Sequence, residues 1–83
     1  MHYVYVIRST VEPDQIYTGL SDDVDRRLAA HNAGQSAHTS KYKPWRLESL
    51  HFFADAAVAI AFEKYLKSGS GRAFSAKRLR PRR

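Results

Sequence analysis

Two tyrosines near the start of the chain are candidates for proton-transfer chemistry. Tyr5 lies in an aromatic and β-branched run at residues 2–7, and Tyr17 lies in a similar run at residues 15–18. If these runs pair as antiparallel strands with Tyr5 opposite Tyr17 or Gly19, both phenols lie on one face of the sheet. Phenols on one sheet face are more often ordinary core residues. Gly19 would let another backbone or a phosphate approach closely.

Arg27 and His31 are spaced i, i+4, so they share one face of a predicted helix. Asp22 and Asp23 each precede an arginine by four residues, the favoured orientation for exposed ion pairs. The spacing alone therefore favours a solvent-exposed helix face. The four histidines have no close metal-ligand spacing, which argues against a histidine metal site.

Glu63 follows a seven-residue apolar run, residues 56–62, on a second predicted helix. Its carboxylate is expected to border the packed face of that helix. A carboxylate that is partly removed from water needs a partner. Lys67 at i+4 is one candidate, and a Mg²⁺ held by one carboxylate, waters and a substrate phosphate is the other. These residues alone leave both partners open.

Length and composition limit the protein classes to be considered. Eighty-three residues suffice for one domain, 1–83, and 43% hydrophobic with 27% charged residues argue against disorder. The absence of cysteine excludes disulfides, thiol catalysis and cysteine-ligated metals. No apolar run approaches the roughly 20 residues of a membrane span, and no signal peptide is recognisable. We therefore expect a cytoplasmic protein without a membrane partner.

The positive charge of the chain is concentrated toward its C-terminal end. Lys and Arg number 14 against 8 Asp and Glu, a net charge of +6, and residues 64–83 contain no acid. A basic C-terminal tail at about residues 75–83 favours a polyanionic partner such as nucleic acid, although a solubilising tail has the same composition. After Lys67, Phe74 and Leu79 are the only large apolar residues, too few for a membrane-surface helix.

The elements that position these residues are expected to form a small α+β domain. Strands are predicted at residues 2–7, 15–18 and 45–53, and residues 34–44 are predicted to be irregular. Helices are predicted at residues 22–33, 56–66 and 71–79, with Ser21, Asp55 and Ser70 as their N-terminal caps. The order β-β-α-β-α-α gives a three-stranded antiparallel sheet flanked by helices.

Taken in order, these residues resemble the GIY-YIG nuclease family. The likeness is carried by Tyr3-Val4-Tyr5-Val6-Ile7, Ile16-Tyr17-Thr18-Gly19, residues 23–28, His31-Asn32 and Glu63-Lys64. It extends from about Tyr3 to Phe74, and small stand-alone bacterial members share stretches like residues 38–45 and 62–72. The chain departs from the family pattern in having Tyr3-Val4 for Gly-Ile and Thr18 inside the second half-motif. Leu20 replaces a lysine of some repair-type relatives.

The resemblance implies an endonuclease that hydrolyses phosphodiester bonds in DNA, single-stranded or branched, with one Mg²⁺ or Mn²⁺. Glu63 would ligate the metal, and Arg27 would stabilise charge on the scissile phosphate. Tyr5, assisted by Tyr17, would position and deprotonate the attacking water, and Arg27 and the metal would favour its phenolate. His31 would relay a proton or contact phosphate.

The alternative is a non-catalytic nucleic-acid-binding module of the same fold, directed to its target by a partner protein. Such a module needs basic residues and exposed aromatic rings, but no carboxylate at the metal position. Because the chain retains the whole catalytic set, we favour the enzyme. The DNA is expected to contact further residues in either case: Gly19, His38, Lys41, Lys43, Arg72, Lys77, Arg78 and the terminal arginines 80, 82 and 83.

Overall fold

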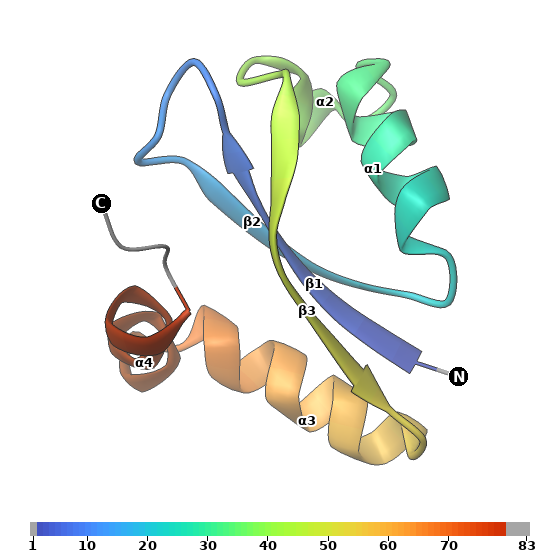
Figure 1. The fold of residues 1–83 in the computed structure, drawn as a ribbon, viewed down its shortest axis with the longest axis vertical. Helices are drawn as coiled ribbons and strands as arrows, with labels where there is room; N and C mark the ends of the chain where they lie inside the picture. Colours follow the sequence, from blue (N-terminus) through green and yellow to red (C-terminus); the bar gives the residue numbers. More distant parts are fainter. Residues whose placement is uncertain (1, 80–83) are drawn as a thin grey trace.

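Three antiparallel strands form a sheet that separates two groups of helices (Figure 1). The computed structural model describes residues 2–79. The strands are β1 (His2–Ser9), β2 (Ile16–Ser21) and β3 (Trp45–Phe53), in the sheet order β2-β1-β3. The helices are α1 (Val24–Asn32), α2 (Ala37–Ser40), α3 (Ala56–Lys67) and α4 (Gly69–Arg78). The predicted α+β class and its β-β-α-β-α-α order are confirmed, with the one-turn helix α2 as an addition.

The central strand β1 is buried on both of its faces, because successive side chains point to opposite sides of the sheet. Toward α3 and α4, the buried cluster consists of Val4, Val6, Ala59 and Leu66. Toward α1 and α2, it consists of Tyr5, Ile7, Val24 and Trp45. This explains why the first apolar run is continuous rather than alternating.

The hairpin register fixes the two tyrosines relative to each other. Tyr5 pairs with Gly19, and Ile7 pairs with Tyr17. This is one of the two predicted registers, and it places Tyr5 and Tyr17 diagonally on the same face of the sheet.

Asp23, and not Ser21, is the N-cap of α1. Its side chain accepts a hydrogen bond from the backbone N–H of Arg26 at 3.1 Å. The Ser21 hydroxyl instead accepts from the N–H of Asp23, the residue directly before the first helical residue, Val24. The predicted cap at Asp55 is confirmed, since its carboxylate accepts from the N–H of Ala57 at 2.8 Å.

Ser68 caps α4, so the predicted cap at Ser70 was wrong. Its hydroxyl accepts from the N–H of Gly71 at 3.1 Å. A Cβ at Gly71 would lie 1.7 Å from the carbonyl oxygen of Tyr65, so this glycine allows α4 to begin directly against the end of α3. Gly71 therefore serves close packing inside a helix rather than breaking one.

The prediction that residues 34–44 are irregular needs correction, because they contain helix α2, in which Thr39 is buried. The predicted final helix is confirmed, and residues 75–78 of the basic tail are the last turn of α4. The terminal arginines 80, 82 and 83 lie outside the described residues.

None of the helices between residues 2 and 79 has the length and apolar character needed to cross a bilayer. The cytoplasmic location expected from the sequence stays a prediction.

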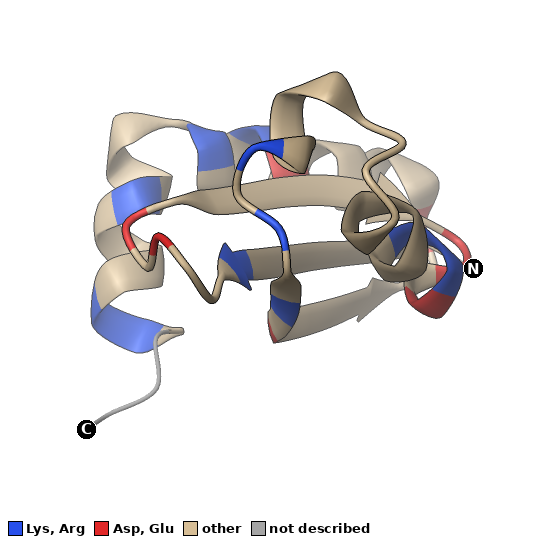
Figure 2. Cartoon of the chain, turned by 90° about the horizontal axis from the view of Figure 1, so that it is seen from above, with Lys and Arg blue, Asp and Glu red and all other residues tan. Residues whose placement is uncertain are grey.

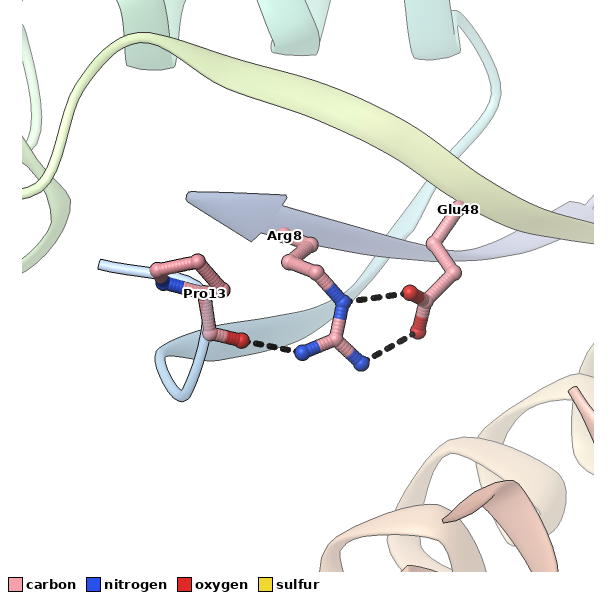
Figure 3. Close-up of polar contacts among 3 residues, drawn as sticks. All are labelled: Arg8, Pro13 and Glu48. Atoms are coloured by element: carbon pink, nitrogen blue, oxygen red, sulfur yellow. Dashed lines mark hydrogen bonds and ion pairs between the residues drawn. The ribbon is translucent and has the colours of Figure 1, made fainter. Parts of the chain in front are cut away.

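A buried ion pair links the sheet to the loop between β1 and β2 (Figure 3). The Arg8 guanidinium on β1 donates from Nε to Oε1 of Glu48 at 2.5 Å and from Nη2 to Oε2 at 3.1 Å. Its Nη1 donates to the carbonyl oxygen of Pro13 in the loop. The Arg8 and Glu48 side chains are 10% and 0% exposed. One guanidinium thus holds β1, β3 and the hairpin loop together.

Replacing Glu48 with Leu should lower the free energy of unfolding by about 3 kcal/mol, because it leaves the Arg8 charge buried without a partner. The double variant Arg8→Met/Glu48→Leu should recover most of this loss, since neither charge then remains. Urea denaturation measures both, with Glu12→Ala as an exposed control that changes stability by less than about 0.5 kcal/mol. A double variant no more stable than Glu48→Leu would contradict this account.

Candidate active site

The hydroxyl of Tyr5 lies 3.1 Å from Nε2 of His31, and this hydrogen bond is buried. Tyr5 comes from the central strand and His31 from the last turn of α1, and their side chains are 0% and 1% exposed. The exposed position predicted for His31 was therefore wrong. The helix face that it shares with Arg27 is divided, because α2 covers the C-terminal end of α1 while Arg27 remains exposed.

A second layer of residues holds His31 from behind. Nδ1 of His31 lies 2.8 Å from Oγ1 of Thr39 on α2, and Thr39 is completely buried. The carbonyl oxygen of Thr39 accepts from Nε1 of Trp45 at 2.9 Å, and the Asn32 amide bonds both backbone groups of Trp45. No individual role was predicted for Thr39, Asn32 or Trp45 from the sequence. The sequence signal that could have found this layer was Trp45, because a buried indole N–H needs a hydrogen-bond acceptor.

Tyr17 extends the site across the sheet surface. Its ring centroid lies 6.3 Å from that of Tyr5, 4.9 Å from that of His31 and 6.2 Å from that of His38. Gly19 provides the space for this cluster, because a Cβ there would lie 2.4 Å from the Tyr5 hydroxyl oxygen. The Tyr5 ring therefore occupies the space that the missing Cβ leaves at Gly19.

Arg27 is the exposed cationic member of the site. Neither of the predicted aspartate–arginine ion pairs on α1 is present among the described residues, and Asp23 caps the helix instead. The neighbouring Tyr5 hydroxyl raises the pKa of Arg27, so the guanidinium is always charged. A pocket of about 160 Å³ opens beside it, lined by Arg27, Ala30, His31, Gln35 and Ser36.

Burial sets the protonation states of the two hydrogen-bonded groups. It raises the pKa of the Tyr5 phenol, and the nearby Arg27 guanidinium opposes this effect without cancelling it. Arg27 thus lowers the pKa of the Tyr5 phenol, as predicted, but burial has the larger effect. The phenol of the free protein is therefore protonated at neutral pH. Burial, and then the charge of Arg27, lower the pKa of His31, so its imidazole is neutral.

Glu63 lies on α3 with 17% of its side chain exposed, and it forms an ion pair with Lys67. Of the two partners that the sequence left open, this structure contains Lys67. Lys67 is also close enough to Tyr5 for its charge to oppose the effect of burial on the pKa of the phenol. Within the described part of the chain, no three His, Asp or Glu side chains converge on a common point. The end of α3 therefore offers one partly exposed carboxylate, Glu63.

The family model for the GIY-YIG catalytic domain matches residues 1–77. The chain belongs to the GIY-YIG nuclease family. A UPF0213 protein of Haloquadratum walsbyi is 37% identical over 68 residues, which cover 81% of this chain and 74% of that protein. The structure-specific endonuclease subunit SLX1 of Podospora anserina is 35% identical over 69 residues, but these cover only 20% of its length.

The fold has a solved counterpart among small proteins of similar length. The solution NMR structure of a UPF0213 protein from Bacillus halodurans superposes with a TM-score of 0.58 at 28% sequence identity. The match covers 96% of this chain and 87% of that protein. The arrangement of strands and helices is therefore shared with this UPF0213 protein.

The basic residues expected to contact DNA lie on two separate surfaces of this GIY-YIG domain. The first surface adjoins Tyr17 and consists of exposed residues on α2 and in the loop before β3: His38, Lys41 and Lys43. The second is on α4, which packs on α3 at the other face of the sheet, and consists of Arg72, Lys77 and Arg78 (Figures 1 and 2). Only the first surface is continuous with the aromatic cluster.

The free energy of unfolding should fall as the pH is lowered from 7.5 to 5.5. The unfolded chain binds a proton on His31 near pH 6.5, whereas the folded site binds it only at lower pH, so protonation favours unfolding. Urea denaturation across this range should show a shallower slope for His31→Gln, with a remainder from His51, whose pKa burial also lowers. An unchanged slope in His31→Gln would contradict the assignment.

Proposed function

We propose that this GIY-YIG domain is a divalent-metal-dependent endonuclease that hydrolyses phosphodiester bonds in DNA. The observation that carries the proposal is the Tyr5 hydroxyl, held in the core by His31 beside the exposed Arg27. Phosphodiester hydrolysis requires a proton-transfer group next to an anion-binding group, and here the anion-binding Arg27 lines an open pocket. The likeness to SLX1, named as a structure-specific endonuclease subunit, supports a structured substrate such as branched DNA.

Each polar side chain has a distinct task in this proposal. The exposed Arg27 guanidinium binds an oxygen of the scissile phosphate and stabilises the charge that develops there. Tyr5, with Tyr17 beside it, orients the attacking water, and the Tyr5 oxygen accepts its proton. His31 holds that oxygen in place from the buried side. Tyr5 and His31 are fixed by packing, so of these three side chains only Arg27 has to adjust to the substrate.

Glu63 is the residue that would hold the metal which the family implies. When bound, Mg²⁺ or Mn²⁺ would neutralise negative charge on the phosphate and the leaving oxygen. The observed ion pair supports the fit, because the carboxylate already holds one cationic group and remains partly exposed. A single carboxylate also suits Mg²⁺, which keeps several waters and binds substrate phosphate. Lys67 has to leave the Glu63 carboxylate for this exchange.

The same ion pair supports a second candidate, a nucleic-acid-binding module without catalysis that depends on a partner protein for targeting. In that case Lys67 would remain on Glu63, and DNA would contact only the two basic surfaces. Incubation of the protein with labelled single-stranded, branched and duplex DNA separates the two functions. Cleavage in Mn²⁺ that EDTA abolishes supports the enzyme, whereas binding without cleavage supports the module.

Glu63→Gln should abolish cleavage while the fold and most of the DNA binding remain. The substitution keeps the size of the side chain and removes the charge that attracts a hard cation. Gel assays of cleavage and binding, with circular dichroism for the fold, measure the three properties. Glu12→Gln, in the exposed hairpin loop, is the matched control. Full cleavage by Glu63→Gln would reject Glu63 as the metal ligand.

Arg27→Ala should lower the cleavage rate by roughly 10²-fold or more, in line with the loss of one preorganised donor to the transition state. Arg26→Ala is the control, because Arg26 is equally exposed on the same helix but points about 100° away from its neighbour. Single-turnover rates at saturating DNA separate this effect from weaker binding. Equal rates for the two variants would remove Arg27 from the site.

A further inference from the structure

We propose that Thr39 is a positioning residue that fixes the ring tautomer of His31 and so makes His31 a hydrogen-bond donor to Tyr5. The inference deepens the proposed function and rests on it for its effect on cleavage. Its structural part, the tautomer of one buried histidine, can be measured without any substrate.

The first step concerns the hydroxyl of Thr39. This residue is completely buried on α2, and its Oγ1 lies 2.8 Å from Nδ1 of His31. Among the described residues, Nδ1 of His31 is the only hydrogen-bond partner of the Thr39 hydroxyl. A buried hydroxyl hydrogen without an acceptor is costly, so Thr39 donates its hydrogen to Nδ1.

The second step follows from the chemistry of imidazole. His31 is neutral in the folded protein, so its ring carries one proton. Since Nδ1 accepts from Thr39, the proton lies on Nε2, which faces the Tyr5 oxygen at 3.1 Å. His31 is therefore the donor and Tyr5 the acceptor. The two hydroxyls and the neutral ring bring three hydrogens to two contacts, so one hydroxyl hydrogen is not held by His31. We assign this to Tyr5, because its oxygen adjoins the exposed Arg27, from where a water can accept the hydrogen, whereas Thr39 is enclosed behind the ring.

This arrangement matters because burial disfavours a charged phenolate at Tyr5. An oxygen that accepts from His31 and lies beside the Arg27 guanidinium is stabilised in its ionised form. The opposite tautomer would accept the hydrogen of the phenol and keep Tyr5 neutral. Thr39 thus prepares Tyr5 to take a proton from water, although it touches neither Tyr5 nor the pocket beside Arg27.

The surrounding elements keep Thr39 in this position. Its N–H donates to the carbonyl of Ser36 at 3.2 Å, and its carbonyl accepts from the Trp45 indole at 2.9 Å. The titratable and charged groups that face the Tyr5–His31 pair come from three elements: Arg27 on α1, Tyr17 on β2 and Lys67 on α3, with His38 of α2 beside Tyr17. These groups remain unchanged in variants of Thr39.

The test compares wild type with Thr39→Val, which removes the hydroxyl at nearly constant size, and with Thr39→Ser, which keeps it. Ser40→Ala is the matched control, because its hydroxyl lies on the same helix and contacts only the Ala37 carbonyl. Nitrogen-15 NMR of the His31 ring should show the Nε2–H tautomer in wild type, Thr39→Ser and Ser40→Ala. Thr39→Val should shift toward the Nδ1–H tautomer, and titration of the Tyr5 phenol should show a higher pKa.

Cleavage provides the second readout. Thr39→Val should cut DNA roughly tenfold more slowly at neutral pH, with its pH–rate profile displaced to higher pH and with Thr39→Ser restoring the wild-type profile. The inference is overturned if wild-type His31 carries its proton on Nδ1, a measurement that does not depend on any variant folding. It is also overturned if Thr39→Val retains the Nε2–H tautomer. If the wild-type protein cuts no DNA, the proposed function fails, and the NMR measurements still decide the role of Thr39.

Discussion

The hydrogen bond between Tyr5 and His31 is the interaction on which the rest of the site depends. It joins the central strand to the last turn of α1 inside the core, where an unpaired polar group is costly. His31 has two ring nitrogens, so its burial requires a partner on each side. Tyr5 satisfies one of them and Thr39 the other, which requires α2 to cover the end of α1. The geometry of three elements therefore follows from burying one imidazole ring.

The candidate catalytic residues differ in burial, and their proposed roles differ accordingly. Tyr5 and His31 are held in a region of low dielectric, where hydrogen bonds are strong and orientations fixed, and where each group stays neutral in the free protein. Arg27 is exposed and charged, so an incoming phosphate can reach it. In the proposed mechanism, the phenolate therefore needs further positive charge, which a bound divalent cation would supply.

Local sequence patterns correctly predicted the strands that position the site. The alternation of side chains placed Tyr5 and Tyr17 on one face, and the run at residues 45–53 and the cap at Asp55 were predicted correctly because they depend on near neighbours. The predictions failed where distant segments meet. Helical spacing showed that Arg27 and His31 share a face, but whether that face is covered depends on α2. Likewise, Arg8 and Glu48 are 40 residues apart, and only the register of β1 with β3 brings them together.

The separation of the two basic surfaces has a consequence for how a polyanion is bound. The described residues extend over 31 × 27 × 20 Å, about four Debye lengths of about 8 Å at physiological salt along the longest axis. Under the proposed function, the cations on α4 therefore act mainly on nucleic acid close to α4 and are largely screened from a strand bound beside the tyrosines. His38 adjoins Tyr17, and under the proposed function we expect it to contact the backbone together with Lys41 and Lys43. In that proposal the two surfaces contact different parts of the backbone, and contacts to phosphates alone carry no preference for base sequence.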